Sequence, residues 1–213
     1  MKFKDRIKQF GFVATLKNTF FFLIRNIVRV DSYIVLIIEN HRCSSIDDRV
    51  FNITNEKIEL WTKMGFISEK ESTRFQKFLN LGSIGYYIEI QNELAAWGFV
   101  ETKGSYQYGK YFYQIPESMH ILKNLFVRPK YRGMSLGKYI NEARINNVPD
   151  SFIPCGFVVP KNRYAIRNLK MYGFKEYLKI SHISWFKSFK KIKIQILENN
   201  KSSQLIISGF KNE

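Results

Sequence analysis

The sequence predicts a single mixed α/β domain, and three observations support this. The chain has 213 residues, of which 45% are hydrophobic and 16% aromatic, so it is long enough for one buried core and short for two. It contains no internal repeat and no glycine- or serine-rich linker. Local patterns predict two early helices, then three strands, an alternation of strand and helix, and a terminal pair of strands.

The N-terminal segment has apolar residues at mostly helical spacing, with lysines and arginines between them: Phe3, Ile7, Phe10, Leu16, Phe20, Leu23 and Ile27. We expect a helix over residues 3–28 that packs on the domain; a helix lying on a membrane surface is the alternative. Arg25 and Arg29 interrupt the apolar run, which falls short of the roughly 20 residues of a membrane span. No small-residue cleavage site follows, so we expect a cytoplasmic protein.

The remaining elements follow from short sequence patterns. β-Branched residues predict a strand over 32–39, and helices are predicted over 55–65 and 69–79, the second with a Ser68/Glu71 capping pair. A tyrosine-rich connection is expected over 102–117, and Pro129 ends the strand that follows it. The other expected strands are 84–91, 93–101, 120–127, 152–159, 174–180 and 182–196, with helices over 135–146 and 161–172.

The formal net charge of +16 is the strongest signal in the composition. It favours an anionic partner, such as a nucleic acid, a membrane, an acidic protein or a small molecule carrying phosphates. No RNA-binding or helix-turn-helix pattern occurs, so nucleic acid is not the partner we expect. Cys43 and Cys155 lack the spacing of a metal site and fit a reducing compartment, so neither a disulfide framework nor a bound metal is predicted.

The segment NLFVRPKYRGMSLGKYI, from Asn124 to Ile140, combines a strand with a basic, glycine-containing turn and the start of a helix. Backbone amides at a helix N-terminus point outward and attract phosphate, and the helix dipole adds positive potential. Gly133 and Gly137 let the backbone approach a ligand without an intervening Cβ. The segment therefore predicts a phosphate-binding turn, although it is neither a Rossmann fingerprint nor a Walker loop.

A second motif, NRYAIRNLKMYGF, follows about thirty residues later. Together the two motifs resemble those of the Gcn5-related N-acetyltransferase (GNAT) superfamily, V-x-P-x-x-[RQ]-x-x-G-x-[GA] and N-x-x-A-I-x-x-[YL]-x-x-x-G-F. The matching residues are Val127, Pro129, Arg132, Gly137, Asn162, Ala165, Ile166, Gly173 and Phe174. The resemblance implies a GNAT-like, mostly antiparallel sheet flanked by helices. It makes residues 51–196 the acyltransferase core, with residues 1–50 an added N-terminal helix and strand and 197–213 a tail.

By similarity to that family, the core would bind a coenzyme A (CoA) thioester, either acetyl-CoA or a longer acyl-CoA. Leu125, Phe126 and Val127 would pair with the pantetheine amides and polarise the thioester, and Asn162 would contact the pantetheine arm. The turn would hold the pyrophosphate through Arg132, Gly133, Met134, Ser135, Leu136, Gly137 and Lys138.

Three positions depart from the family pattern. Ser135 replaces the middle glycine of the first motif, and its hydroxyl could help to cap the helix. Leu169 replaces the tyrosine that many relatives use as general acid, and Ile121 occupies the usual position of the base. A tyrosine at 169 should change turnover little, because a thiol with a pKa of about 8.5 leaves without much acid help.

The missing acid/base pair favours an acceptor amine that is largely neutral near pH 7. A lysine, with a pKa of about 10.4, needs a strong base, whereas an amine on a sugar ring should ionise lower. The remaining candidate bases are His120, Glu117 and Glu101. The alternatives are that His120 is a strand-end histidine bonded to backbone and that the two glutamates are solvated.

Three classes of function stay open. The first is N-acylation of a nucleotide-linked amino sugar, a dTDP or UDP sugar for surface polysaccharide, and the sequence loosely resembles such enzymes. The nucleotide base or sugar would stack on Tyr106, Tyr108, Tyr111 and Tyr113. The second class is acylation of a protein or peptide amine, and the third is a non-catalytic acyl-CoA-binding or basic surface-binding module. An acyl carrier protein as donor, peripheral membrane contact and a homo-oligomer also stay open.

Overall fold

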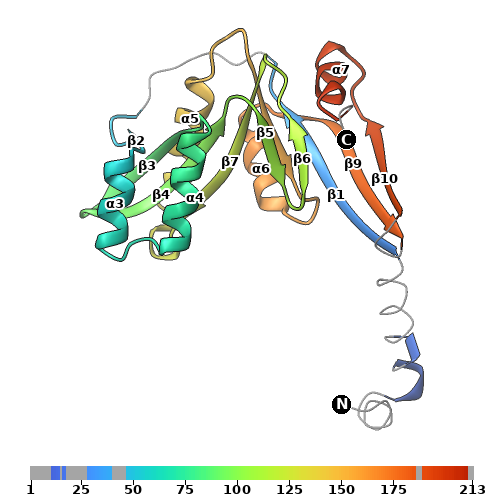
Figure 1. Ribbon diagram of the computed structural model, residues 1–213, viewed down its shortest axis with the longest axis horizontal. Helices are drawn as coiled ribbons and strands as arrows, with labels where there is room; N and C mark the ends of the chain where they lie inside the picture. The colour runs from blue at the N-terminus through green and yellow to red at the C-terminus, as the bar shows by residue number, and fades with distance from the viewer. Residues whose placement is uncertain (1–10, 15, 18–27, 40–46, 186–188, 211–213) are drawn as a thin grey trace.

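The computed structural model describes residues 11–14, 16–17, 28–39, 47–185 and 189–210. An eight-stranded sheet runs through the described part of the chain in the order β10-β9-β1-β8-β7-β4-β3-β2 (Figure 1). Only β7 and β8 pair in parallel within it, and every other pair is antiparallel. The strands are β1 Val28–Ile37, β2 Phe51–Asn52, β3 Ile84–Ile90, β4 Glu93–Glu101, β7 Met119–Val127, β8 Ile153–Val158, β9 Lys175–Trp185 and β10 Phe189–Ile196.

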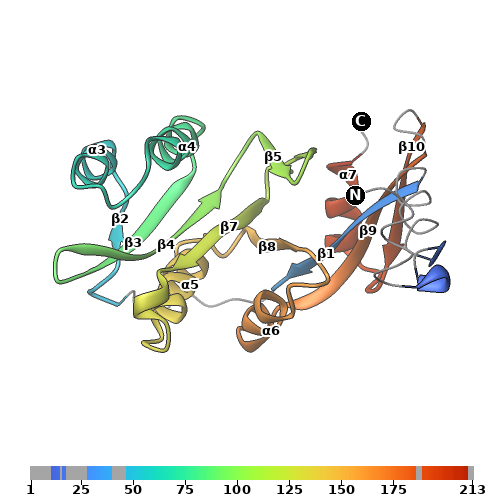
Figure 2. The same cartoon turned by 90° about the horizontal axis from the view of Figure 1, so that it is seen from below.

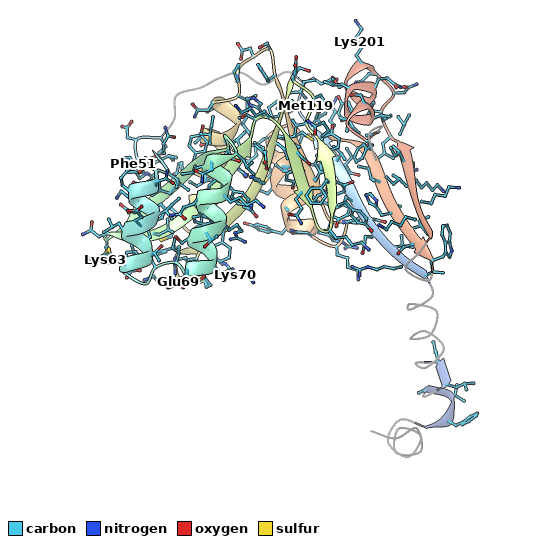
Figure 3. The ribbon with its side chains drawn as sticks, viewed as in Figure 1. Phe51, Lys63, Glu69, Lys70, Met119 and Lys201 are labelled. Carbon is cyan, nitrogen blue, oxygen red and sulfur yellow. The ribbon has the colours of Figure 1, made fainter. Side chains whose placement is uncertain are left out.

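Helices lie on both faces of this sheet (Figure 2). One face carries α3 (Asn55–Lys63), α4 (Glu69–Asn80) and α7 (Lys201–Ser208); the other carries α5 (Leu136–Asn146) and α6 (Arg163–Met171). The predicted capping pair is confirmed, because Ser68 and Glu71 each bond the other's backbone N–H at the start of α4. Charged side chains at the ends of α3 and α4, such as Lys63 and Lys70, are exposed (Figure 3). No helix in the described residues has the length and apolar composition to cross a membrane.

Strand β1 is a central strand of the sheet. It pairs with β8 on one side and with β9 on the other, and Val35, Leu36 and Ile37 at its end are fully buried. It begins at Val28, four residues earlier than the sequence pattern predicts. The segment 1–50, which we expected as an addition to the core, therefore supplies a strand from within the sheet. The predicted boundary at residue 50 itself stays a prediction.

Strands β7 and β8 pair only at one end and then separate. Met119 to Ile121 align with Ile153 to Cys155, and beyond this point β7 pairs with β4 alone while β8 continues beside β1. The β4–β7 register shifts between Trp97 and Phe99, and Asn124 has a left-handed φ of +52°. This irregularity is a β-bulge, a feature that bends a strand. It turns the end of β7 away from β8 and opens the sheet.

The sequence patterns missed several elements of the structure, including the short strand β2. The connection 102–117 folds into a hairpin of β5 (Ser105–Tyr108) and β6 (Tyr111–Gln114), and the tail contains α7. The last pair of strands also differs, since β9 runs unbroken to Trp185 where we expected a break near residue 181. Of the predicted N-terminal helix, only 11–14 and 16–17 are described, and there Phe12, Val13 and Leu16 are exposed and not packed on the domain. The rest of that prediction lies outside the described residues.

Candidate active site

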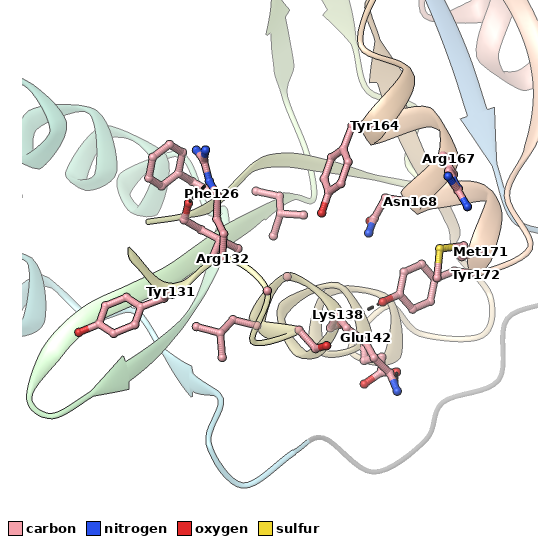
Figure 4. Close-up of a pocket in the computed structure, with 16 residues that line it drawn as sticks. Phe126, Tyr131, Arg132, Lys138, Glu142, Tyr164, Arg167, Asn168, Met171 and Tyr172 are labelled. Carbon is pink, nitrogen blue, oxygen red and sulfur yellow. Dashed lines mark hydrogen bonds and ion pairs between the residues drawn. The ribbon is translucent and has the colours of Figure 1, made fainter. Parts of the chain in front are cut away.

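A cleft of about 1140 Å³ lies where β7 separates from β8 (Figure 4). Its walls are the end of β7, the turn and first residues of α5, and one side of α6. Its volume exceeds the usual 300–1,000 Å³ of ligand pockets, so it suits a long ligand. Phe126, Arg132, Lys138, Tyr164, Asn168 and Tyr172 are among the residues that line it.

The turn before α5 presents a row of free backbone amides. None of the described residues accepts a hydrogen bond from the backbone N–H groups of residues 133–137. Gly133 has a φ of +88°, and Ser135 has a φ of +57° and ψ of +14°. These left-handed conformations interrupt the regular backbone just before α5, and Gly133, Ser135 and Gly137 all line the cleft. The turn therefore offers unpaired amides to a ligand, and phosphate binding by it stays a prediction.

One detail of this prediction is wrong. Ser135 is the N-cap residue of α5, but its side chain makes no capping hydrogen bond. Its carbonyl accepts instead from the backbone N–H of Lys138 at 2.8 Å. A cap residue normally has an extended backbone, and the left-handed φ of Ser135 is not the conformation in which a serine hydroxyl reaches the N2 or N3 amide.

The end of β7 contributes both an apolar surface and an open strand edge. Leu125 and Val127 pack with the core on the α5 side, and a Cβ added to Gly137 would lie 3.5 Å from Val127 Cγ2. Phe126 points to the other face of the sheet, where its ring lies 4.6 Å from that of Trp97. Because β8 pairs with β7 only as far as Ile121, the edge from Leu125 to Val127 is free of β8 and faces the cleft.

Helix α6 supplies the opposite wall. The expected inward residues Ala165, Ile166 and Leu169 do pack on the core. The side of α6 that remains faces the cleft with Tyr164, Arg167, Asn168, Met171 and Tyr172. None of these five residues was among the site residues predicted from the sequence. Their spacing of three and four residues was a usable signal, because it marks a single helix face.

Asn162 begins α6 and acts as its cap. Its side-chain oxygen accepts a hydrogen bond from the backbone N–H of Ala165 at 3.1 Å. It is not among the residues that line the cleft. Its predicted contact with a pantetheine arm therefore stays a prediction, whereas its capping role is visible.

A buried polar network joins the two helices below the cleft. The Asn141 amide in α5 donates to the Asn168 side-chain oxygen in α6, and the Asn141 oxygen accepts from Arg144. Arg144 also donates to the backbone carbonyl of Lys123 at 3.0 Å, just before the β7 bulge. Burial lowers the pKa of Arg144 to about 10, so this guanidinium still carries its charge at neutral pH. The network holds α5, α6 and the bulged strand in one arrangement.

The cleft is electropositive. Arg132, Lys138 and Arg167 lie along it, and Glu142, 3.8 Å from the Lys138 ammonium, is the single acidic residue that lines it in the described part of the chain. Tyr172 donates a hydrogen bond from its hydroxyl to the Lys138 carbonyl at 3.3 Å, and burial raises the pKa of that hydroxyl to about 12. These charges, together with the free amides, suit a ligand that carries phosphates.

None of the three candidate bases lines this cleft. His120 is buried at the paired end of β7, with its ring 4.5 Å from that of Phe152. Glu101 is buried in an ion pair with Lys123, whose ammonium also lies 3.8 Å from the centre of the Phe78 ring. Glu117 is exposed in the turn before β7. The structure does not bring these residues together, and their catalytic roles stay predictions.

The four hairpin tyrosines are also away from the cleft. Tyr106, Tyr108 and Tyr113 are buried against the sheet, and the Tyr113 hydroxyl donates to the Ile206 carbonyl at 3.0 Å. Tyr111 stacks on His182 with ring centres 3.4 Å apart. Stacking of these rings on an acceptor stays a prediction, and the structure gives them a packing role.

Leu169 occupies the position of the family's tyrosine, and it is packed in the core. It is 7% exposed, and a Cβ at Gly156 in β8 would lie 2.8 Å from its Cδ1. A tyrosine at this position would overpack the site, at a cost of about 1–3 kcal/mol. The tyrosines of α6 that line the cleft are Tyr164 and Tyr172, on the neighbouring face of the helix.

Solved structures share this architecture, although the sequence matches no protein-family model and no curated protein. A GNAT-family acetyltransferase from Colwellia psychrerythraea has a TM-score of 0.53 and 13% identity, over 81% of this chain and 62% of that chain. A protein from Novosphingobium aromaticivorans assigned to the GNAT acetyltransferases has a TM-score of 0.52 and 17% identity, over 73% of this chain and 64% of that one. The chain therefore has the GNAT fold, as the two motifs predicted. It spans less than two thirds of the length of these neighbours.

Proposed function

We propose that the protein is an N-acyltransferase that uses an acyl-CoA thioester and transfers the acyl group by direct attack of an amine. The observation that carries this proposal is the cleft at the β7–β8 separation. It combines a free strand edge, five free backbone amides and three cations in a volume suited to a long phosphorylated ligand. An acyl-CoA donor implies a reaction in the cytoplasm.

In this proposal each wall of the cleft has one task. The amides of residues 133–137, with Arg132 and Lys138, hold the pyrophosphate at the start of α5. The edge from Leu125 to Val127 pairs with the amide-containing arm and directs a backbone N–H at the thioester oxygen. The open face at Gly137 leaves room for the arm between α5 and β7, because nothing but Val127 and Leu125 would contact a Cβ there.

The acceptor we propose is a nucleotide-linked amino sugar. The net charge of +16 exceeds what a donor with a few phosphates needs, and a diphosphate on the acceptor would use it. Among the described residues, the cleft is lined by no histidine, and its one carboxylate, Glu142, is beside Lys138. An amine that ionises below lysine needs less help from a base, and a sugar amine meets that condition.

Two measurements test the proposal. Calorimetry should detect micromolar binding of acetyl-CoA or a longer acyl-CoA, together with an increase in melting temperature. A panel of acyl-CoA donors should then be combined with dTDP- and UDP-linked amino sugars and with lysine peptides at equal concentration, with products identified by mass spectrometry. We expect a sugar nucleotide to be acylated fastest. Absence of acyl-CoA binding would overturn the enzyme proposal, and faster acylation of a peptide would replace the acceptor.

A further inference from the structure

The outer part of the sheet has one side that the described helices leave open. On the α5 and α6 side, α5 packs against β3, β4 and β7, and α6 packs against β8. Figure 2 shows both helices beneath the middle of the sheet, away from its β10 edge. The opposite side of the same strands is covered, because Ile180 and Ile192 pack in the core with the β5–β6 hairpin and α7.

Strand alternation gives this open side a definite chemistry. The register of β1, β9 and β10 places Val30 opposite Ile183, and Ile183 opposite Lys191. Six residues, which we call the outer basic face, share this side: Val30, Lys179, Ile183, Trp185, Lys191 and Lys193. Val30 is 54% exposed, the three lysines are exposed, and Ile183 and Trp185 are half-buried.

Acidic side chains are missing from the same area. Between Val28 and Ile34 of β1, Lys179 and Trp185 of β9, and Lys191 and Gln195 of β10, no described side chain on this side is an aspartate or glutamate. Asp31 points to the other side, where it accepts a hydrogen bond from Tyr111. Farther along β9, Glu176 is paired with Lys170 of α6 at 2.7 Å. The outer basic face therefore presents exposed apolar groups among uncompensated positive charges.

We propose that the outer basic face docks on an anionic lipid surface. Lysines surrounding apolar and tryptophan side chains are the composition of proteins that bind at the lipid–water boundary. The chain enters β1 at Val28 directly from residues 1–27, which contain six phenylalanines and six lysines and arginines but one aspartate. In the described part of that segment, Phe12, Val13 and Leu16 are exposed.

Charge favours an anionic membrane over two other occupants of this face, the chain's own residues 1–27 and a nucleic acid. Residues 1–27 are themselves basic, so they would be repelled from the outer basic face if they folded over it without an anionic layer between. A nucleic acid binds proteins mainly through contacts of its phosphates with lysine and arginine. It would match the lysines of this face but would place its phosphates against the apolar Val30 and Ile183. An anionic membrane surface accommodates both the lysines and the apolar groups.

The test is binding of the full chain to phosphatidylcholine vesicles with and without phosphatidylglycerol. The variant K191E/K193E reverses two charges on the outer basic face, and K70E/K77E makes the same change to net charge on exposed positions of α4, far from β10 (Figure 3). Wild type should bind only the anionic vesicles at about 0.1 M salt. Each lysine near an anionic membrane surface contributes about 1 kcal/mol to binding. K191E/K193E should therefore weaken vesicle binding at least about tenfold, whereas K70E/K77E should bind within about twofold of wild type.

Trp185 gives a local readout of the same contact. The other two tryptophans, Trp61 of α3 and Trp97 of β4, are buried in one core cluster. Lipids brominated on their acyl chains should therefore quench wild-type fluorescence on vesicle binding, and W185F should show no such quenching. Three results would overturn the proposal. The first is no binding to anionic vesicles, whether or not the protein binds an RNA oligonucleotide tested in parallel, and the second is an equal loss of vesicle binding in the two lysine variants. The third is vesicle binding without quenching of Trp185, which would mean that residues 1–27 cover the face.

Discussion

The side-chain amide of Asn141 in α5 donates a hydrogen bond to the side-chain oxygen of Asn168 in α6. Asn141 is fully buried and also accepts from Arg144, whereas Asn168 lines the cleft. We expect N168A to cost about 1 kcal/mol of unfolding free energy, the value of one hydrogen bond. N141A should cost about 2–3 kcal/mol, because it also removes a partner from a buried charge. Urea unfolding measures both, and equal losses would show that Arg144 does not depend on Asn141.

Substitutions at Gly137 should change the stability of the fold and the binding of the acyl-CoA donor independently. A Cβ there would meet Val127 and Leu125 at ordinary contact distances of 3.5 and 3.9 Å, so alanine fits without strain. G137A should fold with equal stability or gain up to about 1 kcal/mol from better helix propensity. G137L should leave the fold intact but weaken acyl-CoA binding at least tenfold, because its side chain fills the gap between α5 and β7. Calorimetry and thermal unfolding check the two effects, and tight binding by G137L would place the donor elsewhere.

These residues show which parts of the molecule were accessible from sequence. Helices and strands between residues 51 and 174 carry strong local patterns, and the paired motifs around Gly137 and Asn162 predicted the fold and the turn. The hairpin at Ser105–Gln114 was missed because Tyr106, Tyr108 and Tyr113 alternate over segments of only four residues. The Asn141–Asn168 bond was not predictable, because its two residues are 27 positions apart and their contact depends on how two helices meet.

Ser135 occupies a position where the family pattern has glycine and where the backbone is left-handed. Its φ of +57° lies in the left-handed region, which costs a non-glycine residue roughly 1 kcal/mol. Since its hydroxyl does not cap α5, S135G loses no hydrogen bond at the helix start. We expect S135G to raise the unfolding free energy by about 1 kcal/mol and to leave acyl-CoA affinity unchanged. A loss of stability in urea unfolding would mean that the serine hydroxyl has a partner in solution.

His182 should make stability depend on pH. It is 4% exposed, its Nε2 lies 2.8 Å from the Tyr108 hydroxyl, and burial lowers its pKa to about 4 despite the opposing effect of Asp31. The unfolded chain binds this proton with a pKa of about 6.5, so it holds more protons than the folded protein between these values. The contribution to stability is therefore complete above pH 6.5 and is lost as the pH falls toward 4, by at most about 3 kcal/mol.

The variant H182Q tests this assignment. It removes the titrating ring but keeps a polar side chain beside Tyr108. We expect it to be less stable than wild type at pH 8, because it loses the stacking on Tyr111, and to show a flatter decline between pH 6.5 and 4. Unfolding free energies measured by urea across this range give the comparison. An unchanged slope in H182Q would assign the acid sensitivity between pH 6.5 and 4 to groups other than His182.

The last prediction concerns the general acid. The test suggested by sequence, a tyrosine at position 169, is compromised because Leu169 packs against Gly156. Tyr164 is the better probe, since it is 80% exposed and points into the cleft from the first turn of α6 (Figure 4). If a thiolate with a pKa of about 8.5 leaves unaided, Y164F should reduce kcat by less than about threefold. Y172F is the matched control, because that hydroxyl already donates to Lys138. A hundredfold loss in Y164F alone, about 2.7 kcal/mol of barrier, would show that Tyr164 replaces the missing acid.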